Sequence, residues 1–316
     1  MDKDLLRLLG STDISVFPLV FGAGPISGLM TGNDFENQQA TVRRALDAGV
    51  NWFDTGATYG DGQSEASLGK VLQSLGAADC VHLATTVRLT PEDFEDLAGS
   101  VRRSVVRSCQ RLGVSGVTLL QIHNAITRNR DDEPTSIAPA DVLQPGGVLE
   151  AMRQLQSDGI VKHLGITAIG QAEALREVVL SGQFPTIQVP YNLMNPSAGR
   201  GYSEAFDEAN YGNIISQCGD QRMGAFAIRV FAGGVLAGLP PSAHTHKTKF
   251  FPLDALSSGP TACRAVEGVF AGRDDANGCG TTIRDQPSPG HVGHREIWRA
   301  GARRRGYFAA GRRPLA

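Results

Sequence analysis

The sequence predicts a (β/α)₈ barrel, the parallel α/β fold known as a TIM barrel, and three observations lead to this prediction. The chain has 316 residues, which is enough for one such barrel of about 250 residues. From residue 18 onwards, short apolar runs alternate with longer segments of helical period, as in a parallel sheet covered by helices. The repetition of seven runs in one chain favours a barrel over an open sheet.

Each predicted strand is a short apolar run that is bounded by turn-forming residues. Ahead of the first run, the segment LGSTDISVFPLV (9–20) has a turn signal between two extended pieces. This segment predicts a hairpin that plugs the bottom of the barrel. The seven predicted strands are 19–24, 50–54, 80–87, 116–123, 161–167, 186–192 and 224–230.

The segments between the strands are amphipathic, and several end at glycine. Glycine is the residue that most easily adopts the left-handed conformation that follows a helix. We therefore expect helices within 36–49, 91–113, 146–159, 171–182 and 211–224.

The composition changes where the eighth unit should fall, so we divide the chain into a barrel (1–272) and an atypical C-terminal segment (273–316). This segment has nine Arg and four acidic residues, a formal charge of +5, with seven Gly and four Val, Ile or Leu. That composition does not predict a buried strand and a covering helix, which leaves the eighth unit in doubt. Three interpretations stay open: a basic arm for an anionic partner, a disordered tail, or a translation in the wrong reading frame of a GC-rich gene.

The overall composition indicates a globular protein. The chain is 41% hydrophobic and 20% charged, with a formal charge of -2, so we expect no nucleic-acid partner and no membrane partner. The N-terminus lacks an apolar signal region, which predicts a cytoplasmic location. The odd number of cysteines and the lack of CxxC spacing indicate neither a disulfide framework nor a metal site. We expect free thiols, with the first three buried, at Cys80, Cys109, Cys218, Cys263 and Cys279.

Three polar residues follow predicted strands and are candidates for catalysis. Asp54 ends the second apolar run, Tyr59 follows on its loop, and His123 ends the fourth run. In a parallel barrel the C-terminal ends of the strands open into one mouth, so these side chains should meet there. A phenol can exchange a proton with a carbonyl or alcohol oxygen if its neighbours adjust its pKa. Singly, the three residues would read as a turn cap, a rim aromatic and a core histidine, but their common position at strand ends favours an active site.

Six segments of the chain carry a family resemblance. They are FGAGP (21–25), ALDAGVNWFDTGATYGDGQSEASLGKVL (45–72), LLQIHN (119–124), LQSDGIVKHLGIT (155–167), IQVPYNLMNP (187–196) and GGVLAG (233–238). Together they resemble the aldo-keto reductase superfamily. The resemblance covers residues from about 7 to about 250, and includes a weaker likeness to the branch of D-threo-aldose (L-fucose) 1-dehydrogenases.

The resemblance implies a catalytic tetrad of Asp, Tyr, Lys and His, with the Tyr as general acid and base. Asp54, Tyr59 and His123 match three of these positions, but Thr86 stands where the family has its Lys. A hydroxyl carries no charge, so it cannot lower the pKa of Tyr59 as an ammonium at about 4 Å would. Arg88 is two residues further on, and it either shares the face of Thr86 or lies past the strand end on the rim.

The resemblance also implies a nicotinamide cofactor, NAD or NADP, with no indication of which. Thr167 and Ala168 occupy the places of a Ser-Asn pair that binds the carboxamide, and Ala168 has no hydrogen-bonding side chain. Tyr191 lies where family members place an aromatic ring against the nicotinamide, although it can equally be a core aromatic. Arg229 lies in a glycine-rich loop that resembles the pyrophosphate loop of the family. The residues that we expect to contact the cofactor are Gly22, Thr167, Gln188, Tyr191 and Arg229.

Two functions follow as hypotheses. The first is an NAD(P)-dependent oxidoreductase that interconverts a carbonyl and an alcohol on a small polar substrate, such as an aldose or an aldehyde. The second is a catalytically impaired barrel that acts as a binding or regulatory subunit, because Thr86 replaces the expected Lys and the eighth unit is in doubt. Activity with a nicotinamide cofactor that depends on Tyr59 would separate the two.

Overall fold

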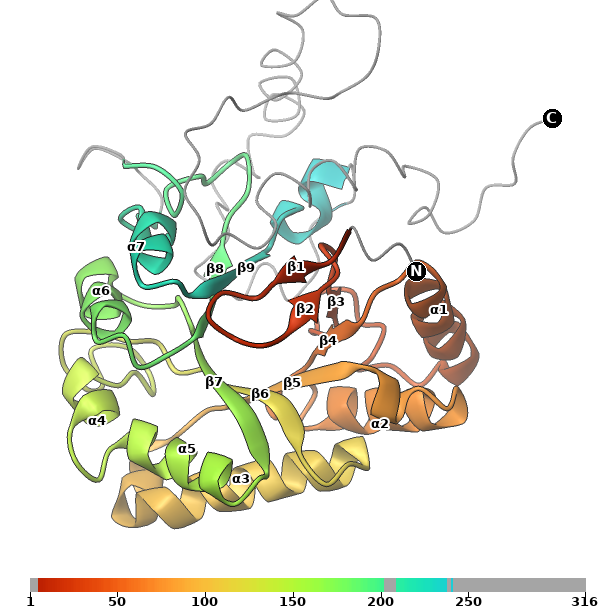
Figure 1. Ribbon diagram of the computed structural model, residues 1–316, viewed down its shortest axis with the longest axis horizontal. Coiled ribbons are helices and arrows are strands. Elements are labelled where there is room, and N and C mark those ends of the chain that lie inside the picture. The colour runs from red at the N-terminus through yellow and green to blue at the C-terminus, as the bar shows by residue number, and fades with distance from the viewer. Residues whose placement is uncertain (1–4, 202–208, 238–239, 241–316) are drawn as a thin grey trace, which may run out of the picture.

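Seven parallel strands form a curled sheet in the order of the chain (Figure 1). The structure is a computed structural model that describes residues 5–201, 209–237 and 240. Sequential order and uniformly parallel pairing, with helices on the outside, are the arrangement of a (β/α)₈ barrel, so the predicted fold class is confirmed. The predicted segment 273–316 lies outside the described residues. The strands are β3 (Phe21–Gly22), β4 (Trp52–Asp54), β5 (His82–Val87), β6 (Val117–Ile122), β7 (Val161–Thr167), β8 (Thr186–Pro190) and β9 (Gly224–Ile228).

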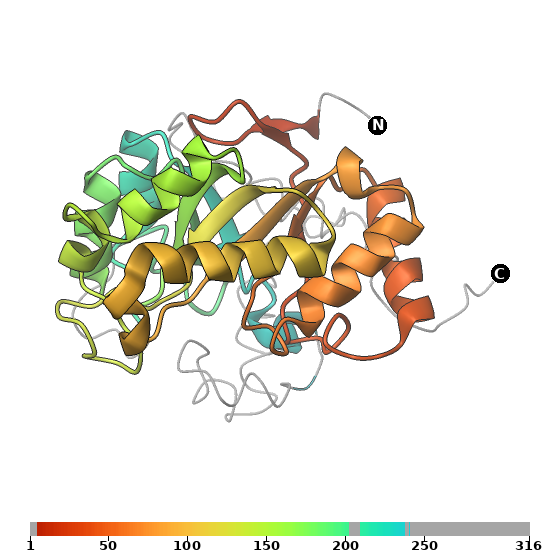
Figure 2. The ribbon, with the colours of Figure 1, turned by 90° about the horizontal axis from the view of Figure 1, so that it is seen from below.

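The helices cover the outer face of the sheet, and Figure 2 shows the longest of them, α3, crossing in front of it. The sequence explains the ends of α3: the Asp96 side chain accepts a hydrogen bond from the Gly99 amide, and Gly113 ends the helix at φ 71°. Between them, Val101 and Val105 pack into the core. The helices are α1 (Phe35–Asp47), α2 (Gln63–Ser74), α3 (Leu97–Leu112), α4 (Pro139–Leu143), α5 (Val148–Ser157), α6 (Ala172–Leu180) and α7 (Ile214–Asp220), with 3₁₀ helices η2 (Ala78–Cys80), η3 (Pro91–Asp96) and η4 (Ala232–Ala237).

A two-stranded hairpin closes one end of the barrel; a hairpin was predicted here, but its first strand lies before the predicted segment 9–20. Its strands, β1 (Arg7–Leu8) and β2 (Ser15–Val16), pair antiparallel, and both figures place the hairpin across the end of the sheet. Asp13, in the turn, binds His163 through an Oδ1–Nε2 contact of 3.1 Å, which locates His163 at this closed end. The buried cluster beneath the hairpin contains Leu9, Ile14, Val16, Trp52, Ala84, Leu119 and Phe226.

Alternation along the strands decides which side chains enter the barrel. Trp52, Ala84 and Leu119 belong to the buried cluster beneath the hairpin, inside the barrel. The residues two positions further along these strands, Asp54, Thr86 and Gln121, therefore also point inward. Gly165 shares this inner face, and a Cβ on it would lie 2.4 Å from Thr186 Oγ1 and within 3.2 Å of the Gln121 side chain. Because glycine has no side chain, position 165 provides the space that the side chains of Thr186 and Gln121 occupy.

Of the three cysteines among the described residues, two follow the prediction, and Cys263 and Cys279 lie outside those residues. Cys109 and Cys218 are buried free thiols, but Cys80 is exposed. The prediction for Cys80 was wrong because this residue ends η2 and precedes β5, which begins at His82. The inward and outward alternation of the strand therefore does not reach Cys80.

Candidate active site

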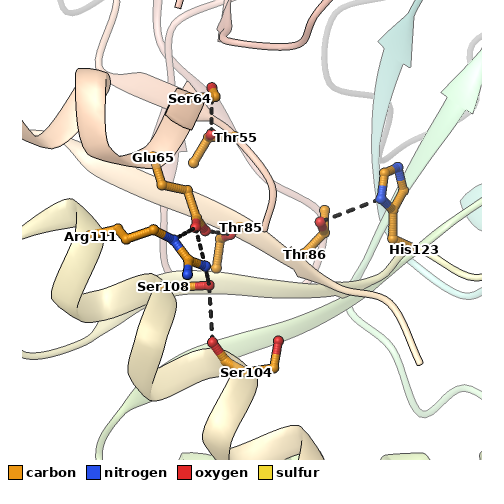
Figure 3. Close-up of polar contacts among 9 residues, drawn as sticks. All are labelled: Thr55, Ser64, Glu65, Thr85, Thr86, Ser104, Ser108, Arg111 and His123. Carbon is orange, nitrogen blue, oxygen red and sulfur yellow. Dashed lines mark hydrogen bonds and ion pairs between the residues drawn. The ribbon is translucent and has the colours of Figure 1, made fainter. Parts of the chain in front are cut away.

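The structure brings Asp54, Tyr59, Thr86 and His123 together at the open mouth of the barrel. Asp54 ends β4 and His123 directly follows β6, while Tyr59 lies on the loop between β4 and α2. The rings of Tyr59 and His123 meet edge to face, with centroids 5.6 Å apart. The Thr86 hydroxyl lies 3.5 Å from His123 Nδ1 (Figure 3), and the hydroxyl of Thr58 lies at the same distance from that nitrogen.

Asp54 is a buried carboxylate that two amides hold in place. Gln121 Nε2 donates to Asp54 Oδ2 at 3.0 Å and Gln188 Nε2 donates to the same oxygen at 2.6 Å. Sequence reasoning missed Gln121, although its position two residues before His123 places both on the inner face. Gln188 was expected to contact the cofactor; in this structure its amide nitrogen binds Asp54, and its role toward a cofactor stays a prediction.

Burial raises the pKa of Asp54 to about 7, and the hydrogen bonds from Gln121 and Gln188 oppose this rise. The ordinary pKa of an aspartate is 3.8. Between these two values the unfolded chain has lost the proton while the folded protein keeps it. The stability that Asp54 contributes is therefore complete below about pH 4 and is lost as the pH rises to about 7.

We expect Asp54→Asn to remove this pH dependence, because the asparagine oxygen can still accept both amide hydrogen bonds and never ionises. The variant should gain stability relative to the wild type by on the order of 3 kcal/mol between pH 5 and pH 7. Urea unfolding of both proteins across this range measures the difference. A constant difference would show that Asp54 ionises in the folded protein as it does in the unfolded chain.

Burial, together with the charges nearby, leaves both Tyr59 and His123 neutral near pH 7. Burial, and then the Asp54 charge, raise the pKa of Tyr59, while Arg229 lowers it. Burial is also the largest cause that lowers the pKa of His123 to about 4, with Arg88 and Arg229 adding to it. A protonated phenol and a neutral imidazole are therefore present together, and each can hydrogen-bond to one substrate oxygen.

Thr86 is a buried residue next to Gly56, at the position where the resemblance implies a lysine. Its side chain is 1% exposed, and a Cβ on Gly56 would lie 2.6 Å from Thr86 Oγ1 and 3.2 Å from the ring of Tyr59. In the part of the chain that the structure describes, the two lysines are remote from this position. Lys70 lies over the Phe35 ring and Lys162 binds Asp13 at the closed end.

Arg88 lies on the rim of the mouth. Strand β5 ends at Val87, and the exposed guanidinium of Arg88 donates to the Thr135 hydroxyl at 3.0 and 3.2 Å. The guanidinium of Arg88 therefore does not take the place, inside the site, of a lysine ammonium at position 86. Its charge still acts on His123, whose pKa it lowers.

A second polar network supports the site from outside the sheet, and sequence reasoning did not anticipate it (Figure 3). Glu65, at the start of α2, is fully buried. Its carboxylate accepts from the Thr85 hydroxyl at 2.5 Å and from Arg111 Nε at 2.7 Å. Because Thr85 and Thr86 point to opposite faces of β5, this network anchors the strand directly behind Thr86.

The expected cofactor residues lie on the side of the mouth formed by β3, β7, β8 and β9. Thr167 ends β7 in register with Gln188, and its buried hydroxyl has no hydrogen-bond partner within the described residues. A Cβ on Gly22 would meet no described atom within 4 Å, so the backbone is open to close approach there. Tyr191 is half-buried against Gly199.

Arg229 directly follows β9, in the left-handed region at φ 58°. This position brings its charge close enough to influence Tyr59. The buried hydroxyl of Thr167, which has no hydrogen-bond partner within the described residues, suits a neutral amide, and the positive charge of Arg229 and the exposed backbone of Gly22 suit an anionic group. The residues present thus fit a nicotinamide cofactor, as the resemblance implies.

Two further properties follow from the described residues. They contain no group of three or more His, Cys, Asp or Glu that could hold a metal ion. Nor does any of their helices have the length and apolar character required to cross a membrane.

Comparison with curated proteins finds relatives among sugar dehydrogenases. The chain is 31% identical to L-galactose dehydrogenase of Arabidopsis thaliana over 170 residues, which cover 54% of this chain and 50% of that protein. It is 25% identical to D-threo-aldose 1-dehydrogenase of a Pseudomonas species over 253 residues, which cover 72% and 70% of the two chains. The chain thus spans about half the length of the first of these relatives.

A solved structure and a family model agree with these relatives. An aldo/keto reductase from Klebsiella pneumoniae, solved in complex with NADP and acetate, superposes with a TM-score of 0.53 at 20% identity, over 73% of this chain and 70% of that one. This similarity supports the barrel fold. The model of the aldo/keto reductase family matches residues 18–250, most of the chain. The protein therefore belongs to the aldo/keto reductase family.

Proposed function

We propose that this protein is an NAD(P)-dependent oxidoreductase that interconverts a carbonyl and an alcohol on a small polar substrate such as an aldose or an aldehyde. The observation that carries the proposal is the edge-to-face contact of Tyr59 and His123 beside the buried Asp54. Two relatives of the chain are named as sugar dehydrogenases, which supports a sugar or a similar polyol as substrate.

In this proposal each residue of the mouth has one role. A bound nicotinamide would supply or accept the hydride. The Tyr59 hydroxyl donates its proton to the carbonyl oxygen during reduction and takes it back from the alcohol during oxidation. The neutral imidazole of His123 orients the same oxygen by a hydrogen bond. Because the pKa of Tyr59 is raised, the phenol is protonated near pH 7, which favours reduction there and oxidation at higher pH.

Residues on β7, β8 and β9 would hold the cofactor. The hydroxyl of Thr167, which lacks a partner within the described residues, would bind the carboxamide, and Gln188 would contribute beside it. Tyr191 would pack against the nicotinamide ring. Arg229 would supply positive charge toward the phosphates of the cofactor. The Klebsiella pneumoniae reductase was solved with NADP, which supports a nicotinamide cofactor in general, and we leave the choice between NAD and NADP open.

The test is an assay of the full chain in both directions. Reduction of glyceraldehyde with NADH and NADPH, and oxidation of L-galactose and L-fucose with NAD and NADP, are followed by the absorbance of the reduced nicotinamide. We expect turnover of one aldehyde or aldose with one cofactor. Cofactor binding is measured in parallel by fluorescence titration with NADPH and NADH, so that a lack of turnover is distinguished from a lack of binding.

A second function has one observation in its favour, namely Thr86 beside Tyr59 and His123. Burial and the Asp54 charge raise the pKa of Tyr59, and Arg229 opposes this rise. Threonine at position 86 adds no positive charge to that opposition. A barrel with this site could bind a cofactor and a carbonyl compound without useful turnover, and act as a binding or regulatory subunit. Cofactor binding with no turnover of any tested substrate would favour this second function.

A further inference from the structure

An arginine-lined cavity of about 240 Å³ lies beside the proposed active site, on its β4 and β5 side. Its walls come from the loop after β4, the segment after β5 and one face of α3. The lining of this cavity includes Ala57, Arg88, Arg103, Ser104, Arg107 and Arg111. The expected nicotinamide contacts come from β3 and from β7 to β9, so the cavity is a different site.

The spacing of residues on α3 concentrates positive charge on one face of the helix. Arg103, Arg107 and Arg111 are four residues apart, so their side chains lie above one another. Like charges at this spacing destabilise a helix unless something compensates them. The compensation differs among the arginines, and this difference identifies the part of the cavity that can accept a ligand.

Two of the four arginines are already neutralised by carboxylates. Arg103 Nη1 binds Asp96 at 2.8 Å, and Arg111 Nη2 binds the buried Glu65 at 2.6 Å. Asp93 also lines the cavity; its Oδ2 accepts from the backbone nitrogen and the hydroxyl of Thr90. Burial raises the pKa of Asp93, but hydrogen bonds from Thr90 and Ser100, together with the charge of Arg103, hold this pKa below its ordinary value.

Arg88 and Arg107 have no carboxylate within ion-pair distance in the described part of the chain. Arg88 donates to the neutral hydroxyl of Thr135, and Arg107 is an exposed side chain on the cavity wall. Two uncompensated guanidinium groups therefore line one concave space, and the hydroxyl-bearing Ser104 also belongs to its lining. Guanidinium groups bind phosphate oxygens through paired hydrogen bonds, and a hydroxyl can add a third.

We propose that this cavity binds a phosphate group, with Arg88 and Arg107 as its main ligands. The volume accommodates a phosphate and part of the molecule that carries it. The site is close to the mouth along the chain, because Ala57 is two residues before Tyr59 and Arg88 is two residues after Thr86. The phosphate belongs either to a free phosphate ion or to a phosphorylated substrate that extends over the rim.

The experiment is a calorimetric titration of the full chain with inorganic phosphate at low ionic strength. Arg107→Gln should weaken phosphate binding roughly tenfold, as expected for the loss of a hydrogen bond to a charged group. The Arg88→Gln, Arg107→Gln double variant should show no measurable binding. The matched control is Arg102→Gln, which makes the same change in charge on the same helix at a residue that is paired with Asp158 outside the cavity.

The source of the phosphate is decided by kinetics with two aldehydes. If the substrate carries the group, Arg107→Gln raises KM for glyceraldehyde 3-phosphate roughly tenfold more than KM for glyceraldehyde. If the ratio of the two KM values is unchanged while phosphate binding is lost, the ligand is the free ion. The proposal is overturned if the wild type does not bind millimolar phosphate, or if Arg102→Gln weakens binding as much as Arg107→Gln. Both of these binding results come from titration, which needs no turnover, so they are independent of the proposed enzymatic function.

Discussion

Replacement of Tyr59 by phenylalanine is expected to lower kcat by about 10²- to 10⁴-fold, the contribution of a positioned general acid or base. The change removes one oxygen and keeps the ring that packs edge to face on His123. Folding and cofactor affinity should therefore be retained, and the loss should appear in kcat. Steady-state kinetics with the best aldehyde and cofactor, together with cofactor titration, measure both quantities.

A matched control for this variant is Tyr211→Phe, which removes the hydroxyl of another buried tyrosine. Tyr211 lies before α7 and is not among the residues to which we assign proton transfer. Its variant should lose much less than tenfold in kcat. A Tyr59→Phe enzyme that turns over at the wild-type rate would show that another group carries the proton, and the assignment of Tyr59 would be abandoned.

Thr86→Lys is expected to raise kcat about tenfold or more. An ammonium about 4 Å from the phenol, at an effective dielectric constant of about 20, favours the ionised tyrosine by up to about 4 kcal/mol. This favourable interaction opposes burial and the Asp54 charge, which both raise the pKa of Tyr59. The same ammonium would stabilise the ionised form of Asp54. The pH profile of kcat for alcohol oxidation should therefore shift to lower pH along with the gain in rate.

Thr86→Met separates charge from size in this experiment, because methionine is nearly as long as lysine and carries no charge. The methionine variant should show no gain, since the additional side chain would only press on Tyr59 and His123. Both variants are first tested for cofactor binding. If the lysine variant binds cofactor and gains nothing over the wild type, the site functions with Thr86 as it stands, and the argument from the missing ammonium is wrong.

The gross architecture could be predicted because it depends on local patterns. Apolar runs of strand length alternate with amphipathic segments, and a parallel sheet with right-handed crossovers is the arrangement that buries both. The hairpin was recognisable from a turn signal between two extended pieces. Asp54, Tyr59 and His123 could be grouped because parallel strands in sequential order bring their C-terminal ends together.

The partners of these residues could not be predicted in this way. Asp54 is held by Gln121 and Gln188, which are 67 and 134 positions away in the chain. Such contacts depend on the curvature of the sheet, which brings side chains from strands that do not pair with one another to the same point inside the barrel. The exposure of Cys80 likewise depended on where β5 begins, and sequence patterns place the ends of elements only to within a few residues.

The sequence by itself determined the order of strands and helices, the hairpin at the closed end and the identity of three residues at the mouth. Only the tertiary structure decided that Arg88 reaches Thr135 on the rim, that Glu65 ties α2 to α3 and β5, and that arginines from α3 and the end of β5 line one cavity. The physical reason is that apolar periodicity acts on neighbouring residues within one element. The direction and charge environment of a polar side chain instead depend on which distant elements pack against it.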